Sequence, residues 1–180
     1  MDTNPERDGM LTVFILATDD PGPLEPTFRA LVPGSVSGVV SDVVVVSPAP
    51  DALKAVCEPM GADRVHPDRV AEALENARGE WALLLEAGAQ PLDGWDGAAA
   101  SHMRPDARPA RFEVASQVEP FWRRLFGRPS RPLMAGFLLP ISALGNALRS
   151  TTLSRVPVGR AAVTLPALLR AADDPPRARR

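Results

Sequence analysis

The sequence predicts an α/β domain with a mostly parallel central sheet and helices on both of its faces. Continuous apolar and β-branched runs, such as the four valines at 43–46, are typical of strands buried on both faces. Segments of about ten residues with helical spacing of their apolar positions separate these runs. Strands that alternate with helices favour a parallel sheet, because each connection lays a helix over one face.

The first half of the chain alternates regularly between the two kinds of element. The expected strands and helices are, in order, strand 11–18, helix 24–32, strand 42–47, helix 50–60, strand 63–65, helix 68–77 and strand 81–86. Pro33-Gly34 is expected to end the first helix, and Gly61 stands at the C-cap position after the second.

The second half is less regular in its pattern. We expect a helix at 94–103, a strand at 110–116, an aromatic, Arg-rich amphipathic segment at 119–126, a strand within 133–139, a helix at 141–148, a strand at 161–165 and a last helix at 166–172. Residues 1–9 and 173–180 are polar and predict disordered tails, which leaves a single domain at 10–172.

Composition excludes several classes of protein. The net charge of −2 gives no field that would favour nucleic acid, and no apolar run reaches the roughly 18 residues of a membrane span. Residues 1–9 are polar and do not resemble a signal peptide. Cys57 is the only cysteine, which fits a reducing compartment and a core position. We therefore expect a cytoplasmic protein.

The segment 79–95 carries the most specific pattern in the chain. A buried strand, 81–85, leads into Glu86-Ala87-Gly88 and then a Gly-Trp helix start. This pattern resembles the metal-binding strand end of family 2 glycosyltransferases of the GT-A fold, in which the strand is followed by Asp-x-Asp. The resemblance implies Mg²⁺ or Mn²⁺ at Glu86. Because Gly88 has no side chain to ligate it, such an ion would be held mainly by water and phosphate.

The first two strands extend the resemblance. In the family, the end of the first strand contacts the nucleotide base, which implies a uridine or guanine contact for Thr18 and Asp19. An Asp that contacts the base or ribose after the second strand is replaced here by Ser47, whose hydroxyl can still form a hydrogen bond with a base. Asp51 is either a displaced substitute for that Asp or an acidic residue at the start of the next helix.

The catalytic function that the resemblance implies lacks a candidate base. The family uses an Asp in its second half to deprotonate the acceptor, and residues 120–172 contain no Asp or Glu. Two hypotheses stay open: a glycosyltransferase that uses a nucleotide-diphosphate sugar, and a non-catalytic binding or scaffold protein that retains the fold. For the Arg-aromatic segment 119–131, the alternatives are contact with a membrane surface and packing on the core.

Overall fold

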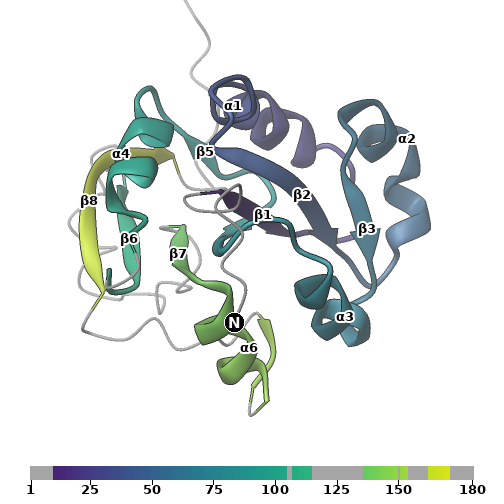
Figure 1. Cartoon of the computed structure of the whole chain (residues 1–180). Coiled ribbons are helices and arrows are strands. Elements are labelled where there is room, and N and C mark those ends of the chain that lie inside the picture. Colours follow the sequence, from purple (N-terminus) through teal and green to yellow (C-terminus); the bar gives the residue numbers. More distant parts are fainter. Residues whose placement is uncertain (1–9, 105–106, 115–135, 150, 154–161, 171–180) are drawn as a thin grey trace, which may run out of the picture.

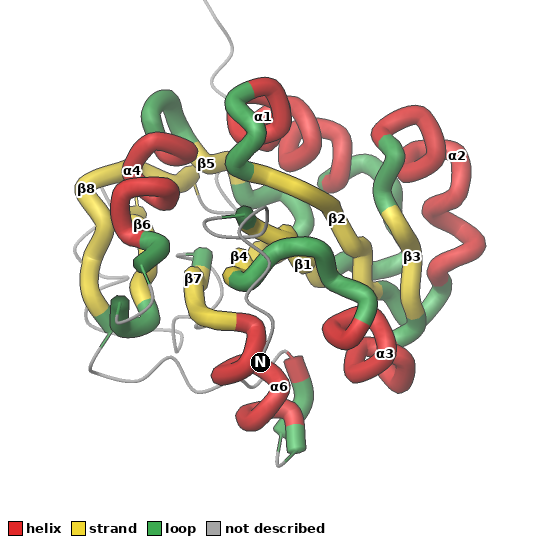
Figure 2. The backbone as a smooth tube through the Cα atoms, in the orientation of Figure 1, coloured by secondary structure: helices red, strands yellow, loops and turns green. Residues whose placement is uncertain are grey.

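The computed structural model describes residues 10–104, 107–114, 136–149, 151–153 and 162–170. Within these residues, the strands form one sheet in the order β3-β2-β1-β4-β7-β6-β8-β5 (Figures 1 and 2). The strands are β1 (Leu11–Leu16), β2 (Val40–Val46), β3 (Asp63–Val65), β4 (Trp81–Glu86), β5 (Gln90–Pro91), β6 (Ala110–Val114), β7 (Phe137–Pro140) and β8 (Val163–Arg170). The expected tails, 1–9 and 173–180, lie outside the described residues.

The sheet has a parallel half and a mixed half. β1 pairs in parallel with β2 and β4, and β2 pairs in parallel with β3. β7 then runs antiparallel to both β4 and β6, β6 runs parallel to β8, and β5 is antiparallel to β8. The predicted mostly parallel sheet is therefore confirmed, and the antiparallel strands come from the half of the sequence that has the less regular pattern.

Helices cover both faces of the sheet, as predicted. The α-helices are α1 (Leu24–Val36), α2 (Lys54–Cys57), α3 (Val70–Glu75), α4 (Trp95–His102) and α6 (Ile141–Leu148), and the 3₁₀-helices are η1 (Pro50–Leu53), η2 (Glu58–Met60) and η3 (Pro67–Arg69). In Figure 1, α1 and α2 lie along one side of the sheet and α3 and α6 along the other. Alternate residues of β1 follow this division: Val13 and Ile15 join one apolar core, and Phe14 joins the other.

The first helix corrects one prediction. We expected Pro33-Gly34 to end it, but α1 continues to Val36 with Pro33 inside. Gly34 is buried, and a Cβ atom there would lie 2.6 Å from Cζ2 of Trp95 in α4. This glycine therefore permits the close approach of two helices and does not mark a helix end. The predicted C-cap at Gly61 is confirmed by its left-handed φ of 64°.

The end of the chain corrects another prediction. The expected strand 161–165 and helix 166–172 are replaced, in the described part, by the single strand β8. Leu165, Ala167 and Leu169 are buried and alternate with exposed residues, which is the period of a strand covered on one face. The register against β6 shifts between Leu165 and Leu168, so Pro166 lies in an irregularity where a ladder N–H is not needed. The two-residue strand β5 was not predicted.

No helix in the described part of the chain is long and apolar enough to cross a membrane.

Candidate functional site

The carboxyl ends of four parallel strands meet at one edge of the sheet. Leu16 of β1 lies opposite both Val46 of β2 and Glu86 of β4, and Val46 lies opposite Val65 of β3. These four residues form one row across the sheet, so the segments that follow them leave the sheet at the same level. In open α/β sheets, ligands bind beyond this edge.

The segment after β1 places its polar side chains in solvent. Thr18, Asp19 and Asp20 are all exposed. The hydroxyl of Thr18 accepts a hydrogen bond from the backbone N–H of Asp20 at 3.3 Å, and the Asp20 carboxylate accepts one from the N–H of Gly22 at 2.9 Å. These two local hydrogen bonds fix the shape of the loop. Asp19, which is exposed, lies between Thr18 and Asp20 in the sequence.

Ser47, the first residue after β2, is fully buried. Its hydroxyl donates to the backbone carbonyl of Thr18 at 2.8 Å and accepts from the N–H of Ala49 at 3.1 Å. In this arrangement the hydroxyl faces the protein and joins the β1 and β2 loops. Ser47 therefore supports the position of Thr18, whereas the sequence had suggested a direct contact with the ligand.

Asp51 lies at the start of a helix, which is the second of the two roles that the sequence left open for it. It lies in the first turn of η1, and its side chain is exposed. An acidic residue there favours the positive end of the helix. The structure does not bring Asp51 into the row of strand ends that Leu16, Val46 and Glu86 define.

Three backbone N–H groups in the turn after β4 donate hydrogen bonds, one each to β4, β1 and α1. The N–H of Ala89 donates to the carbonyl of Glu86 at 3.0 Å, and the N–H of Ala87 donates to the carbonyl of Leu16 at 2.8 Å. Gly88 has a φ of 96°, a region that favours glycine, and its N–H donates to Oγ1 of Thr27 at 2.8 Å. The turn is therefore fixed to both β1 and α1.

Thr27 is the residue at this edge that the sequence analysis missed. It is fully buried in α1, and its hydroxyl also donates to the carbonyl of Pro23 at 3.3 Å. The sequence signal that could have identified Thr27 was a polar residue within the apolar stripe of α1, next to Phe28 and between Leu24 and Leu31.

The described side chains at this edge form no cluster of metal ligands. Within the described ranges, no group of three or more His, Cys, Asp or Glu side chains is placed to hold a metal ion. Glu86 is half-buried at the end of β4, and Gly88 takes a backbone conformation that side chains rarely adopt. At the end of β4, Glu86 is the one residue of the Glu86-Ala87-Gly88 segment with a carboxylate, and Asp19 and Asp20 follow the neighbouring strand β1.

Two other residues with reactive side chains have structural roles here. His66 follows β3, and its Nδ1 accepts from the N–H of Asp68 at 3.4 Å, which caps η3. Cys57 is buried in α2, and this burial raises the pKa of its thiol, with the nearby Arg64 guanidinium acting in the opposite direction. The prediction that Cys57 is a core residue is confirmed.

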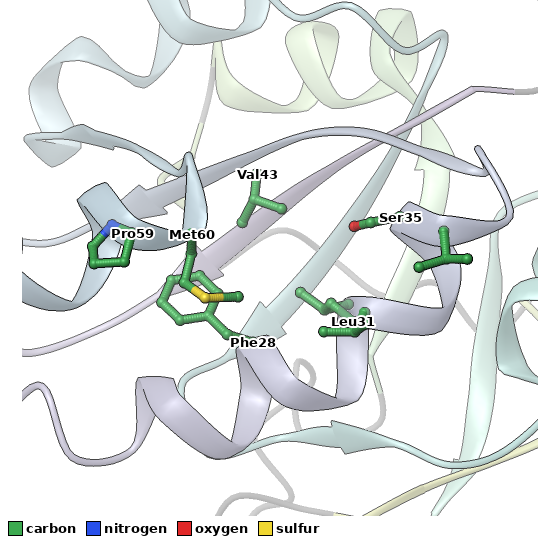
Figure 3. A pocket seen from close by; sticks show the side chains of 8 residues that line it. Phe28, Leu31, Ser35, Val43, Pro59 and Met60 are labelled. Atoms are coloured by element: carbon green, nitrogen blue, oxygen red, sulfur yellow. The ribbon is translucent and has the colours of Figure 1, made fainter.

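A separate apolar groove lies between α1 and η2 (Figure 3). Its volume is about 320 Å³, and its lining residues are Phe28, Leu31, Val32, Ser35, Val36, Val43, Pro59 and Met60. No charged side chain lines it, so it does not offer the polar groups that a nucleotide sugar would require.

The Arg-aromatic segment 119–131 lies outside the described residues, as does about half of the region searched for a catalytic base. The two alternatives for 119–131, contact with a membrane surface and packing on the core, therefore stay open.

The chain matches no protein-family model and no curated protein. Its fold does match solved structures. A mannosyl-3-phosphoglycerate synthase from Rubrobacter xylanophilus is 12% identical with a TM-score of 0.53, and the match covers 74% of this chain and 54% of that one. A glucosyl-3-phosphoglycerate synthase from Mycobacterium tuberculosis, in complex with Mn²⁺, uridine diphosphate and glucosyl-3-phosphoglycerate, is 14% identical with a TM-score of 0.54, and the match covers 75% and 58%.

A third structure, described as a mycobacterial protein, is 14% identical with a TM-score of 0.56, and the match covers 90% of this chain and 65% of that one. The chain thus spans between 54% and 65% of the length of these three structures. At identities this low, the likeness concerns the fold. The order and direction of the strands, together with these neighbours, give the chain the GT-A-like α/β fold of the nucleotide-diphospho-sugar transferases.

Proposed function

We propose that the chain binds a nucleotide-diphosphate sugar at the carboxyl edge of β1, β2 and β4. The observation that carries the proposal is the register of the sheet, which sets the end of β1, with Thr18 and Asp19 after it, beside Glu86 of β4. This edge belongs to a fold whose solved neighbours include a synthase in complex with Mn²⁺ and uridine-diphosphate-glucose.

In this proposal, the two strand ends recognise different parts of the ligand. Thr18 and Asp19 are exposed beside β1, where a carboxylate and a hydroxyl can accept hydrogen bonds from the ring N–H of a uracil or guanine base. Ser47 acts indirectly, because its hydroxyl holds the carbonyl of Thr18 at 2.8 Å. Glu86 lies at the end of the neighbouring strand and would face the sugar-diphosphate part of the ligand.

A non-catalytic binding or scaffold role is the second candidate, and the turn after β4 favours it. The position that corresponds to the second acidic residue of the family pattern is Gly88, at a φ of 96°. Restoring a carboxylate there would strain the backbone, so the turn itself is built without that ligand. The fold can persist when such chemistry is absent, because function depends on the site and not on the fold.

Calorimetry on the full chain tests the binding proposal. Uridine and guanosine diphosphates, and their glucose and mannose derivatives, are titrated with Mn²⁺ and with EDTA. We expect one nucleotide to bind and Asp19→Asn to weaken its binding by about tenfold or more, since a hydrogen bond to a charged group contributes roughly 1.5–3 kcal/mol. Asp51→Asn, which alters an exposed carboxylate outside the row of strand ends, is the matched control. Failure of every nucleotide to bind would refute the proposal.

Product analysis separates the two candidate functions. The chain is incubated with the nucleotide sugar that binds and with 3-phosphoglycerate, the acceptor named in both synthases. Formation of a glycosyl-3-phosphoglycerate supports a transferase for this acceptor. Binding without turnover, either on this acceptor or by hydrolysis of the donor, supports the binding or scaffold role.

A further inference from the structure

We infer that the apolar groove between α1 and η2 binds a second copy of this chain, so that the protein forms a two-fold symmetric dimer through this face (Figure 3). In such a dimer, each copy supplies a groove and also the side chain that enters the groove of the other. The inference does not rest on the proposed function, because the groove lies over one face of β2 and the candidate site lies at the carboxyl edge of the sheet.

The short edge strand of the sheet explains why the groove exists. β3 has three residues and pairs only with residues 44–46 of β2. Within the described residues, no strand pairs with residues 40–43 on the side of β2 that faces away from β1. Val43 is only partly buried, and it lines the groove together with residues of α1 and with Pro59 and Met60 of η2. The described strands therefore leave this apolar space open.

Exposed apolar side chains gather around the groove. Five large apolar side chains are exposed in the described part of the chain, and three of them line it. Val32 is 44% exposed, Met60 45% and Val36 83%. The other two, Val114 and Leu168, lie on β6 and β8. Single exposed apolar residues are ordinary, whereas a group of them around a groove marks an interaction surface.

The spacing of residues along α1 supports the same conclusion. Phe28, Val32 and Val36 are four residues apart, so they form one row on the helix, which leads from the buried Phe28 to the exposed Val36. Folding does not favour valine at exposed helical positions, because its branched side chain loses rotamer freedom there and alanine is preferred. Burial against a partner gives these two valines a stabilising role that contact with water does not.

The charges on the two sides of the groove indicate the kind of partner. Glu25 and Arg29 of α1 form an ion pair at 2.7 Å, and on the other side Glu58 pairs with Lys54 at 3.6 Å and with Arg64 at 3.8 Å. Both sides therefore carry both signs, while the lining itself is uncharged. Nucleic acid, an anionic membrane or a strongly acidic peptide would meet carboxylates on either side. A second copy brings the same mixture of charges, and a rotation by 180° can set its carboxylates against the cations of the first copy.

Val36 is the side chain that suits the partner's groove. It is the last residue of α1 and the most exposed of the large apolar side chains in the described ranges. Because it borders its own groove, a two-fold axis beside the groove can bring it over the groove of the other copy. The eight lining residues are fewer than the roughly 20–30 residues a side of a standard interface. We therefore expect a weak dimer, with a Kd on the order of 10 µM.

Sedimentation velocity of the full chain between about 1 and 200 µM tests the inference, since a monomer should give way to a dimer over this range. Val36→Lys is expected to weaken dimerisation by about tenfold or more, because it buries an unpaired ammonium group in an apolar groove. A cation in the last turn of a helix is compatible with folding, which circular dichroism and the Tm check. Val114→Lys, the same change at an exposed valine of β6, is the matched control and should alter the Kd by less than about twofold.

Disulfide cross-linking tests where Val36 lies in the dimer. Val36→Cys and Met60→Cys proteins are mixed under mild oxidation, and mass spectrometry identifies the mixed dimer. Cys57 is buried, so the introduced thiols are the accessible ones. We expect the mixed disulfide to form about tenfold faster than the one between Val114→Cys and Met60→Cys proteins, because proximity raises the effective concentration of the two thiols.

The outcomes either support or overturn the inference. A monomer at every concentration would overturn it and would leave the groove to a partner of another kind. A dimer that persists unchanged in Val36→Lys, or that Val114→Lys disrupts equally, would overturn the choice of surface. Equal rates for the two cross-links would overturn the position of Val36 in the partner's groove. Failure of nucleotides to bind would refute the proposed function and leave all of these measurements unaffected.

Discussion

Replacing Gly34 with alanine should destabilise the protein, although the same change normally stabilises a helix. In a helix interior, alanine is favoured over glycine by roughly 0.5–1 kcal/mol. At position 34, however, the new Cβ would lie 2.6 and 2.7 Å from Cζ2 and Cη2 of Trp95 and 2.9 Å from Cγ2 of Val40. Such distances are too short for carbon atoms, so the indole ring or the helix must move.

The gain in helix propensity and the cost of crowding at position 34 can be compared directly. Forcing a methyl group into a packed core typically costs about 1–3 kcal/mol. Trp95 is only 1% exposed, and its Nε1 donates to the carbonyl of Ala30 at 3.1 Å, so the ring cannot turn aside without losing a hydrogen bond. The expected net effect of Gly34→Ala is a loss of about 1–2 kcal/mol after the gain in helix propensity. In a protein of this size, that corresponds to a Tm lower by about 3–6 °C.

Thermal and urea unfolding of four variants test this reasoning: Gly34→Ala, Gly145→Ala, Trp95→Phe and the double variant of Gly34→Ala with Trp95→Phe. Gly145→Ala is the matched control, because Gly145 lies inside α6 and a Cβ there meets nothing within 4 Å. It should raise stability by about 0.5–1 kcal/mol. In a Trp95→Phe background, where the two crowding atoms are absent, Gly34→Ala should cost less than in the natural chain. If Gly34→Ala raises the Tm as Gly145→Ala does, the packing argument is wrong.

Three further predictions concern other contacts. Gly79→Ala should cost about 3 kcal/mol or more in urea unfolding, since its Cβ would lie 2.6 Å from the backbone nitrogen of Thr12, which cannot yield. An unchanged urea midpoint would contradict this. Thr27→Val should cost about 1–3 kcal/mol and speed amide exchange at Gly88, whose buried N–H loses its acceptor. Unaltered exchange would mean that the bond does not hold the turn. Burial raises the pKa of the Cys57 thiol, so above pH about 8.5 the unfolded chain releases a proton that the folded protein retains, and stability falls as pH rises. Cys57→Ala should lack this part of the fall, and identical alkaline slopes for the two proteins would refute the assignment.

The sequence predicted those elements whose cause is local. β3, β4 and α6 begin and end where the apolar patterns indicated, because strand and helix periods are properties of adjacent residues. The end of α1 was misjudged because the role of Gly34 depends on Trp95, sixty-one positions later in the printed sequence. β8 was misjudged because Pro166 suggested a helix start, whereas pairing with β6 tolerates it at a shift in register.

The distinction between local patterns and long-range contacts also applies to the candidate site. The edge of the sheet could be predicted, since the ends of parallel strands meet wherever their order in the sheet allows. The functions of single side chains could not. Ser47 bonds to Thr18 across 29 positions, and Thr27 bonds to Gly88 across 61. Both bonds depend on tertiary structure, and in both a side-chain hydroxyl supports a backbone segment of the candidate site.

The position of β4 in the sheet determines which fragments of the protein would leave a strand unpaired. Residues 81–84 of β4 pair with β1 on one side and with β7 on the other. A fragment that stopped after α4 would contain all the strand ends of the candidate site and would leave one edge of this apolar strand open. Open edges of this kind recruit strands from other chains and lead to aggregation. The later strands therefore cover an edge of β4 that would otherwise be open, and shortening the protein to β1–β4 is expected to lower its solubility while the strand ends of the candidate site remain.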